Sequence, residues 1–184
     1  LTGEQFKVLS VKKTYREKKA PLPFTTSTLQ QEAFKALNFS TSKTMRVAQQ
    51  LYEGVDIKGA GTVGLITYLR TDSVRVSDEA KNMAHDFISE NYGDDFLREG
   101  PGKTSAASRI QDAHEAIRPA DLTRLPSNVK DSLTREQFRL YQLIWRRFMA
   151  SRMSNAKYET TTAKIQAGEY IFSTAASHRI FDGF

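Results

Sequence analysis

The strongest constraint on the fold is a change of hydrophobic period along the chain, from two at both ends to about 3.6 between them. Residues 4–19 alternate, with Phe6 and Val8 on one side and Lys7 on the other, which predicts a strand at the edge of a sheet. From Tyr158 onward the alternation returns, interrupted by the turn letters AGE, and predicts a hairpin. We therefore expect both chain ends to pair into one small antiparallel β lobe.

The residues between these two segments carry apolar side chains at helical spacing. They predict four helices, each starting at a hydroxyl side chain that accepts a backbone N–H. The predicted caps are Thr28, Ser42, Ser77 and Thr134, the predicted stops are Gly54 and Gly93, and the buried stripe of the last helix is Phe138, Tyr141, Ile144, Trp145 and Phe148. The sequence therefore predicts an α+β fold, with residues 1–23 and 155–184 in the β lobe and residues 24–154 in a mainly helical domain.

Positive charge is concentrated at the start of the chain. The net charge is +6, and residues 1–23 hold six Lys or Arg residues against two Glu residues. Such a segment suits a polyanionic partner. Lysines that protect an exposed strand edge give the same pattern, so charge alone favours this second interpretation.

Several classes of protein and site are excluded or disfavoured. The absence of cysteine excludes disulfides and thiolate metal sites and fits a cytoplasmic location. No apolar run is long enough to span a bilayer, so no membrane is expected. Two glycine-containing stretches, residues 54–64 and 98–111, lack the spacing of nucleotide-binding loops. Because the chain begins at Leu1 rather than Met and stops at Phe184, we expect a piece of a longer protein.

The stretch GLITYLRTDS, residues 64–73, joins a β-branched apolar run to a charged turn. A strand over residues 65–69 would place Tyr68 and Arg70 on the same side, because alternate strand residues share a face. A tyrosine oxygen attacks a phosphodiester when a neighbouring cation stabilises the developing charge. A guanidinium suits this task because it stays charged and grips phosphate through two N–H groups. The alternative is a half-buried strand tyrosine beside a surface arginine.

Two further segments are rich in side chains that bind phosphate. Four hydroxyls from Thr25 to Thr28 exceed the need of one helix cap, and hydroxyls at a helix N-terminus suit a phosphate. The letters DAHEAIRP, residues 112–119, gather Asp112, His114, Glu115 and Arg118. His114 is either a structural histidine bonded within its loop or a phosphate ligand. In the second case its bond strengthens when the imidazole is protonated.

GLITYLRTDS, with PFTTSTLQQ before it and QDAHEAIRP after it, resembles the type IA DNA topoisomerases, as do LYEG and LYQLIWRRFMASRM. The resemblance covers essentially all 184 residues. It implies that Tyr68 is the nucleophile, which becomes joined to the 5′ phosphate of a cleaved single strand. It also implies that Arg70 assists at that phosphate and that His114 lies near it. The other DNA-binding side chains that we expect are Thr26, Ser27, Thr67, Ser73 and Arg118.

The resemblance also implies an arrangement, a reaction and partners. The helical domain would be similar to catabolite-activator DNA-binding domains, and the β lobe would belong to the arch that hinges the enzyme's ring open. The implied isomerase cleaves one strand, passes another and religates, which relaxes negative supercoils without ATP. Its implied partners are single-stranded or negatively supercoiled DNA and the remaining domains of the same polypeptide. A monomer associated with the bacterial nucleoid is expected.

The metal-binding half of the family's active site has no counterpart in this sequence. Family members hold Mg²⁺ through acidic residues of a Toprim domain, and no Asp-x-Asp motif is found here. We therefore expect no metal ligand in this chain, and no cleavage by this chain alone. The alternative function is a non-catalytic module that binds single-stranded DNA. A tyrosine recombinase fits less well, because those enzymes surround the tyrosine with several separated Arg and His residues.

Overall fold

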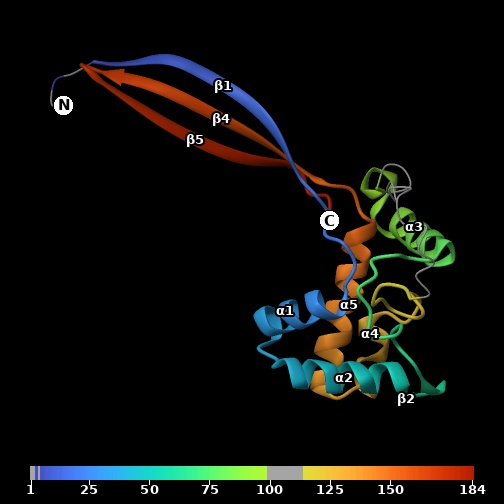
Figure 1. The fold of residues 1–184 in the computed structure, drawn as a ribbon. Helices are drawn as coiled ribbons and strands as arrows, with labels where there is room; N and C mark the ends of the chain where they lie inside the picture. Colours follow the sequence, from blue (N-terminus) through green and yellow to red (C-terminus); the bar gives the residue numbers. More distant parts are fainter. Residues whose placement is uncertain (1–2, 4, 99–113) are drawn as a thin grey trace. The chain divides into compact units, whose positions relative to one another are not determined.

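The computed structural model describes residues 3, 5–98 and 114–184. The chain divides into two compact units, one made of Leu1–Ala20 with Ser154–Phe184 and the other of Pro21–Met153. Figure 1 shows a three-stranded sheet in the first unit and the helices in the second. The fold is therefore α+β, as the change of hydrophobic period predicts. That these units are a ring arch and a nucleophile-bearing domain stays a prediction.

The sheet of the first unit consists of β1 (Phe6–Lys18), β4 (Ala156–Ala167) and β5 (Tyr170–Phe181). The strand order is β1-β4-β5 and both neighbouring pairs are antiparallel, so β4 is central and β1 lies at an edge. This confirms the predicted edge strand, the hairpin and the pairing of the two chain ends. Gly168, in the turn between β4 and β5, has a φ of 59°, a conformation that glycine adopts without strain.

Asn155 and Gly183 lie where the end of β1, the start of β4 and the end of β5 meet. The Asn155 side chain accepts a hydrogen bond from the Ala20 backbone N–H at 3.0 Å and donates one to the Glu17 carboxylate at 2.9 Å. Gly183 has a φ of 62°, and an added Cβ there would lie 2.5 Å from the Ala156 nitrogen. Only glycine therefore allows the chain after β5 to pass this close to the start of β4.

The second unit is built around one long helix. Its helices are α1 (Thr26–Leu37), α2 (Thr41–Glu53), α3 (Asp78–Tyr92), α4 (Pro126–Val129) and α5 (Arg135–Arg152), with 3₁₀ turns at Asp94–Phe96 and Lys130–Ser132 and a hairpin of β2 (Val55–Ile57) and β3 (Gly61–Val63). α1, α2, α3 and α4 all contact α5. Tyr141, Ile144 and Phe148 of α5 are fully buried and Trp145 is 9% exposed, which confirms these four positions of the predicted stripe as core. The fifth, Phe138, is only partly buried.

Several predicted helix boundaries are confirmed. α3 is capped by Ser77 and ends at Gly93, α2 ends at Gly54, and a reciprocal Thr134–Gln137 capping box starts α5. These positions combine a hydroxyl that accepts a free N–H with a glycine that leaves the helix at positive φ. Among the described residues, no helix is long and apolar enough to cross a membrane.

The predicted starts of α1 and α2 are wrong. Thr25, not Thr28, caps α1: its hydroxyl accepts the Thr28 N–H, and the Thr28 hydroxyl accepts the Thr25 N–H. In a run of four hydroxyls the apolar spacing does not fix which of them is the cap. α2 is capped by Ser40 rather than Ser42. Asn38 ends α1 in a left-handed conformation with a φ of 57°, which turns the chain early enough for Ser40 to start the next helix.

Candidate active site

The segment that carries Tyr68 is not a strand. Its only β-type pairing among the described residues is an isolated bridge between Ile66 and Pro119, so the expectation of a strand over residues 65–69 is wrong. Burial nevertheless alternates, with Tyr68 and Arg70 exposed and Leu69 buried between them. The backbone of this segment bonds to several separate parts of the unit instead of to one neighbouring strand.

Thr26, in the first turn of α1, holds the backbone on both sides of Arg70. Its hydroxyl donates to the Leu69 carbonyl at 2.7 Å and accepts the Thr71 N–H at 2.9 Å. Its own backbone N–H donates to the Thr71 carbonyl at 2.9 Å. This hydroxyl therefore donates its hydrogen and accepts one hydrogen bond inside the protein. The contact that we expected between Thr26 and DNA stays a prediction.

Thr67 links the backbone before Tyr68 to the AHEAIRP segment. Its hydroxyl donates to the Ala116 carbonyl at 2.8 Å and accepts the Arg118 N–H at 3.0 Å. Its backbone N–H donates to the Arg118 carbonyl at 2.9 Å. Tyr68 is consequently held next to the segment that contains His114, although some 46 residues separate the two in sequence.

Gly64 brings the same segment against the end of α2. A Cβ at Gly64 would lie 2.8 Å from the Tyr52 carbonyl oxygen, so any larger residue would force the two backbones apart. The next residue, Leu65, donates its N–H to the Leu51 carbonyl at 2.7 Å. This close approach places the last turn of α2, with Tyr52, beside Tyr68.

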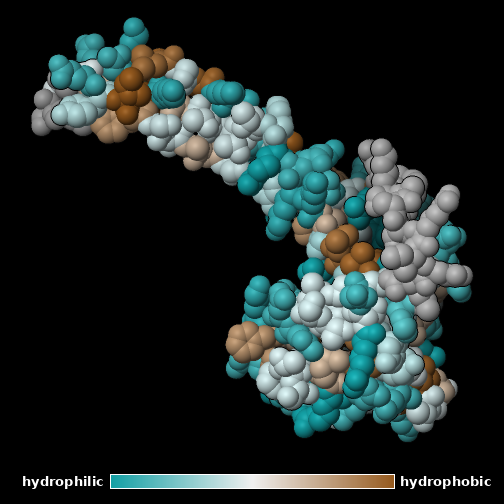
Figure 2. All heavy atoms as spheres, viewed as in Figure 1, coloured by the Kyte–Doolittle hydropathy of each residue, from teal (hydrophilic) through white to brown (hydrophobic). Residues whose placement is uncertain are grey.

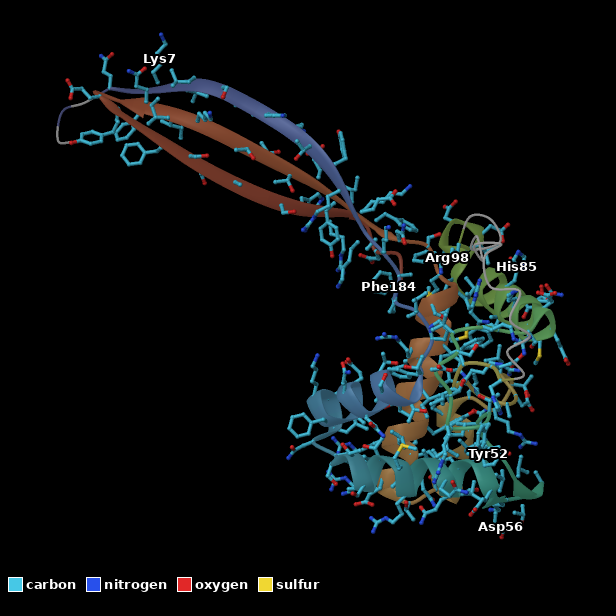
Figure 3. The ribbon with its side chains drawn as sticks, in the orientation of Figure 1. Lys7, Tyr52, Asp56, His85, Arg98 and Phe184 are labelled. Carbon is cyan, nitrogen blue, oxygen red and sulfur yellow. The ribbon has the colours of Figure 1, made fainter. Side chains whose placement is uncertain are left out.

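The Tyr68 ring lies near two other aromatic rings. The Tyr52 ring meets it edge-on with 5.5 Å between centroids, and the His114 ring lies 5.4 Å away at an interplanar angle of 31°. The Tyr68 side chain is 38% exposed and Tyr52 is 39% exposed. The phenol is thus supported by neighbouring rings while it remains accessible from solvent. Figure 3 labels Tyr52 near the C-terminal end of α2.

Tyr52 is a residue to which the sequence assigned no function. Its letters, LYEG, carry part of the family resemblance, but nothing in helical spacing separates an exposed Tyr at the end of α2 from an ordinary surface residue. The sequence signal for Tyr52 is that LYEG is followed by a glycine-rich loop ending at Gly64, the residue whose lack of a side chain permits the contact with α2. The structure adds Tyr52 to the group around Tyr68.

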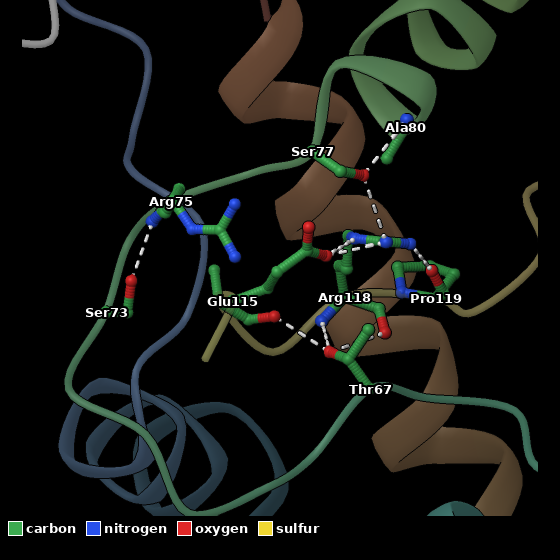
Figure 4. A network of polar contacts seen from close by, with 9 residues as sticks. Thr67, Ser73, Arg75, Ser77, Ala80, Glu115, Arg118 and Pro119 are labelled. Carbon is green, nitrogen blue, oxygen red and sulfur yellow. Dashed lines mark hydrogen bonds and ion pairs between the residues drawn. The ribbon is translucent and has the colours of Figure 1, made fainter. Parts of the chain in front are cut away.

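Arg118 is engaged on every side by protein groups, as Figure 4 shows. Its Nε and Nη2 donate to one Glu115 carboxylate oxygen at 2.8 and 2.6 Å, and its Nη1 donates to the Pro119 carbonyl at 2.9 Å. Nη2 also reaches the hydroxyl of Ser77, the α3 cap, at 3.4 Å. Arg118 therefore shapes the turn after His114 and joins it to α3. Its predicted contact with DNA is not tested by these bonds and stays a prediction.

The other predicted DNA-binding residues fall into two groups. Ser73 is 7% exposed, and its hydroxyl accepts the Arg75 N–H at 3.1 Å, so it shapes the turn. Ser27 and Arg70 are exposed, and within the described residues Arg70 has no ion pair. The structure thus brings Tyr68 and His114 into contact and leaves Arg70 and Ser27 open to solvent. Asp112 and residues 99–111 lie outside the described residues.

The groups around Tyr68 do not fit a magnesium site. Mg²⁺ requires several oxygen ligands in near-octahedral geometry, and no group of three or more His, Asp or Glu side chains close enough to bind a metal ion exists in the described part of the chain. Whether Mg²⁺ is bound by a Toprim domain elsewhere in the polypeptide stays a prediction.

Comparison with known proteins agrees with this arrangement of motifs. A family model described as DNA topoisomerase matches residues 1–184. Full-length topoisomerase I from Thermotoga maritima is 43% identical to the chain and superimposes with a TM-score of 0.84. The match covers 97% of this chain and 28% of that structure, so the chain spans just over a quarter of its solved relative. A match over every residue, together with this identity, shows that the chain belongs to the type IA DNA topoisomerase family.

Proposed function

We propose that Tyr68 is the nucleophile of a DNA topoisomerase and that this chain is its nucleophile-bearing part. The observation that carries the proposal is the exposed phenol held where three motifs meet: the end of α2, the TYLRTDS segment and the segment after His114. A tyrosine that served only the core would be enclosed, as Tyr141 is. Family membership supports the same role.

The proposed reaction exchanges one phosphodiester for another. The Tyr68 oxygen attacks the phosphorus of a single strand, a bond forms between that oxygen and the 5′ phosphate, and the bond to the 3′ oxygen breaks. The phenol loses its proton, and the released 3′ oxygen gains one. Because the bond energy is retained in the phosphotyrosine, the 3′ hydroxyl can reverse the step without ATP. A second strand passes before religation, and negative supercoils relax.

Arg70 and His114 are the groups that we propose for the phosphate. Arg70 is exposed two residues beyond the nucleophile, and a guanidinium stabilises the charge that builds on the phosphoryl oxygens in the transition state. His114 is exposed beside the Tyr68 ring and has a ring N–H to offer to the same phosphate. Thr26 and Thr67 act indirectly, since their hydroxyls position the backbone that carries Tyr68 and Arg70.

The activity of the whole enzyme is proposed to need domains beyond this chain. We propose that the 184-residue chain binds single-stranded DNA weakly and does not cleave it, because a Toprim domain with Mg²⁺ supplies the rest of the active site. The alternative function, a module that only binds single strands, differs in one outcome. It would form no covalent adduct even when that domain is supplied.

The test compares two neighbouring tyrosines in the full-length protein. Tyr68→Phe removes one hydroxyl and should abolish the covalent protein–DNA adduct that denaturant traps, while DNA binding is retained. Tyr52→Phe is the matched control, because it removes the same group from the adjoining ring of a residue that is nearly as exposed, and it should still form the adduct. An adduct with the Tyr68→Phe enzyme, or its loss only in Tyr52→Phe, would show that Tyr68 is not the nucleophile.

A further inference from the structure

The strand register divides the sheet of β1, β4 and β5 into two chemically different faces. In an antiparallel sheet, residues directly opposite one another point to the same face, and successive residues alternate. The observed pairs therefore assign every paired residue of the three strands to a face. We name the face that carries Thr160 the cationic face and the face that carries Glu159 the apolar face.

Every charged strand residue on the cationic face is positive. The six cations are Lys7, Lys12, Arg16, Lys18, Lys164 and Arg179, and all six residues are exposed. Six hydroxyl residues lie between them: Ser10, Thr14, Thr160, Thr162, Ser173 and Ser177. The two carboxylates that the three strands contain, Glu17 and Glu159, both belong to the other face.

The apolar face has balanced charges and large apolar side chains. Its larger apolar and aromatic residues are Phe6, Val8, Val11, Tyr15, Ile165, Tyr170, Phe172 and Phe181. Lys13 and Lys157 offset the two carboxylates, and Lys13 pairs with Glu159 at 3.0 Å. This pair raises the pKa of Lys13 and lowers the pKa of Glu159. Figure 2 shows hydrophobic side chains gathered at the end of the sheet nearest the N-terminus.

The cations of the cationic face are largely available to a partner. Within the described residues Lys7, Lys12 and Lys164 form no ion pair, and Figure 3 shows Lys7 extending away from the sheet. Arg179 is the one that pairs, with Asp182 at 2.8 Å. Arg16 lies over the Tyr158 ring at 5.3 Å and leaves its charge uncompensated.

We propose that the cationic face binds the sugar–phosphate backbone of double-stranded DNA, as a second DNA contact separate from the Tyr68 site. Cations and hydroxyls are the groups that bind phosphate oxygens without reading sequence. Single-strand binders add open aromatic rings on which bases stack, and Tyr158, the one aromatic residue of this face, is covered by Arg16. A duplex offers phosphates and keeps its bases stacked inside, so it matches what this face provides.

The dimensions of the face also suit a duplex. At about 3.4 Å per residue, the 13 residues of β1 extend for roughly 44 Å. A full turn of duplex DNA spans about 34–36 Å, so the strand is long enough to follow one whole turn. The six cations of the face set an upper limit of six phosphates whose charge it can neutralise.

The experiment measures how the affinity of the 184-residue chain for a labelled 20-base-pair duplex depends on salt, by fluorescence anisotropy. The test variant is Lys12→Gln/Lys164→Gln, which removes two charges from the cationic face. The matched control is Lys13→Gln/Lys157→Gln, which removes the same two charges from the same two strands on the apolar face. The two variants have identical composition and net charge. A 20-nucleotide single strand serves as the second probe for both.

Loss of two duplex phosphate contacts should flatten the slope of log affinity against log salt by about 1.8 and weaken binding about 60-fold at 0.1 M salt. The control should keep most of the wild-type slope and affinity, and the single strand should respond less than the duplex. Equal losses in both variants would overturn the proposal, since they would reflect net charge alone. Unchanged duplex binding in the test variant, no measurable duplex binding at all, or a larger effect on the single strand would also overturn it.

Discussion

Thr26 offers a direct test of whether motif hydroxyls hold the site together or touch DNA. The change Thr26→Val keeps the branched shape of the side chain and removes only the hydroxyl. Two groups then lose their partner: the Leu69 carbonyl, bonded at 2.7 Å, and the Thr71 N–H, bonded at 2.9 Å. Leu69 is 1% exposed and Thr71 is 9% exposed, so water replaces the lost hydroxyl poorly.

The size of the effect follows from these two groups. A hydrogen bond inside a protein contributes about 1 kcal/mol net, and an unsatisfied buried partner costs about 1–3 kcal/mol. Because both groups lie at the edge of the core, we expect the free energy of unfolding to fall by about 2–3 kcal/mol. For a chain of this size, each 1 kcal/mol lowers the melting temperature by roughly 2–4 °C. The expected decrease is therefore roughly 4–12 °C.

Ser27→Ala is the matched control, because the Ser27 hydroxyl is exposed and its recorded partner is the Thr25 hydroxyl at 3.2 Å. Its free energy of unfolding should change by less than about 0.5 kcal/mol. Thermal and urea unfolding followed by circular dichroism measure both variants. If Thr26→Val melts at the same temperature as Ser27→Ala but binds single-stranded DNA more weakly, then Thr26 contacts phosphate and the positioning role is refuted.

Two further predictions concern groups around Tyr68 in the full-length enzyme. Arg70→Ala should slow adduct formation about 100-fold or more while DNA affinity falls only a few-fold, since its charge acts mainly in the transition state. Arg70→Lys should recover little of the rate, because a lysine cannot grip phosphate through two N–H groups of one plane. Full recovery with Arg70→Lys would argue against this role of the guanidinium. Tyr52→Leu should lower the rate constant of cleavage more than DNA affinity, whereas Tyr52→Phe keeps the ring contact and the rate. Equal rates for the Leu and Phe variants would remove Tyr52 from the site.

Local patterns in the sequence were sufficient where the structure uses local contacts. Ser77, Gly54, Gly93 and the Thr134–Gln137 box were predicted correctly because a cap bonds to residues within one turn. The alternation at the two chain ends also predicted the sheet, since successive side chains of a strand point to opposite faces. The Thr28 cap failed because its rival, Thr25, is an equally suitable residue three positions earlier.

The Tyr68 segment shows where local patterns stop being sufficient. Its apolar, β-branched residues have the composition of a strand, but their backbone bonds go to the α1 N-terminus, the end of α2 and residues 116–120. None of these partners is near in sequence. The same limit applies to Arg118, because an arginine that organises a turn and an arginine that binds phosphate have the same letters around them. Only the positions of Glu115, Ser77 and Pro119 show that its Nε, Nη1 and Nη2 each bond to a protein group.

The charge pattern of β1 was open to two interpretations because the alternation of its side chains between the two faces changes phase inside the strand. If β1 alternated strictly, Lys12, Arg16 and Lys18 would lie on the same face as Phe6 and Val8, and Lys7 would lie on the other face. The register shifts between Val8 and Ser10, so Leu9 has no partner in β4 and the two parts of the strand change phase. Lys7 thereby joins the other three cations, and Phe6 and Val8 join Val11 and Tyr15. A run of lysines that only protected an edge would need no common face, and their collection on one face by a single bulge favours a surface that binds a polyanion.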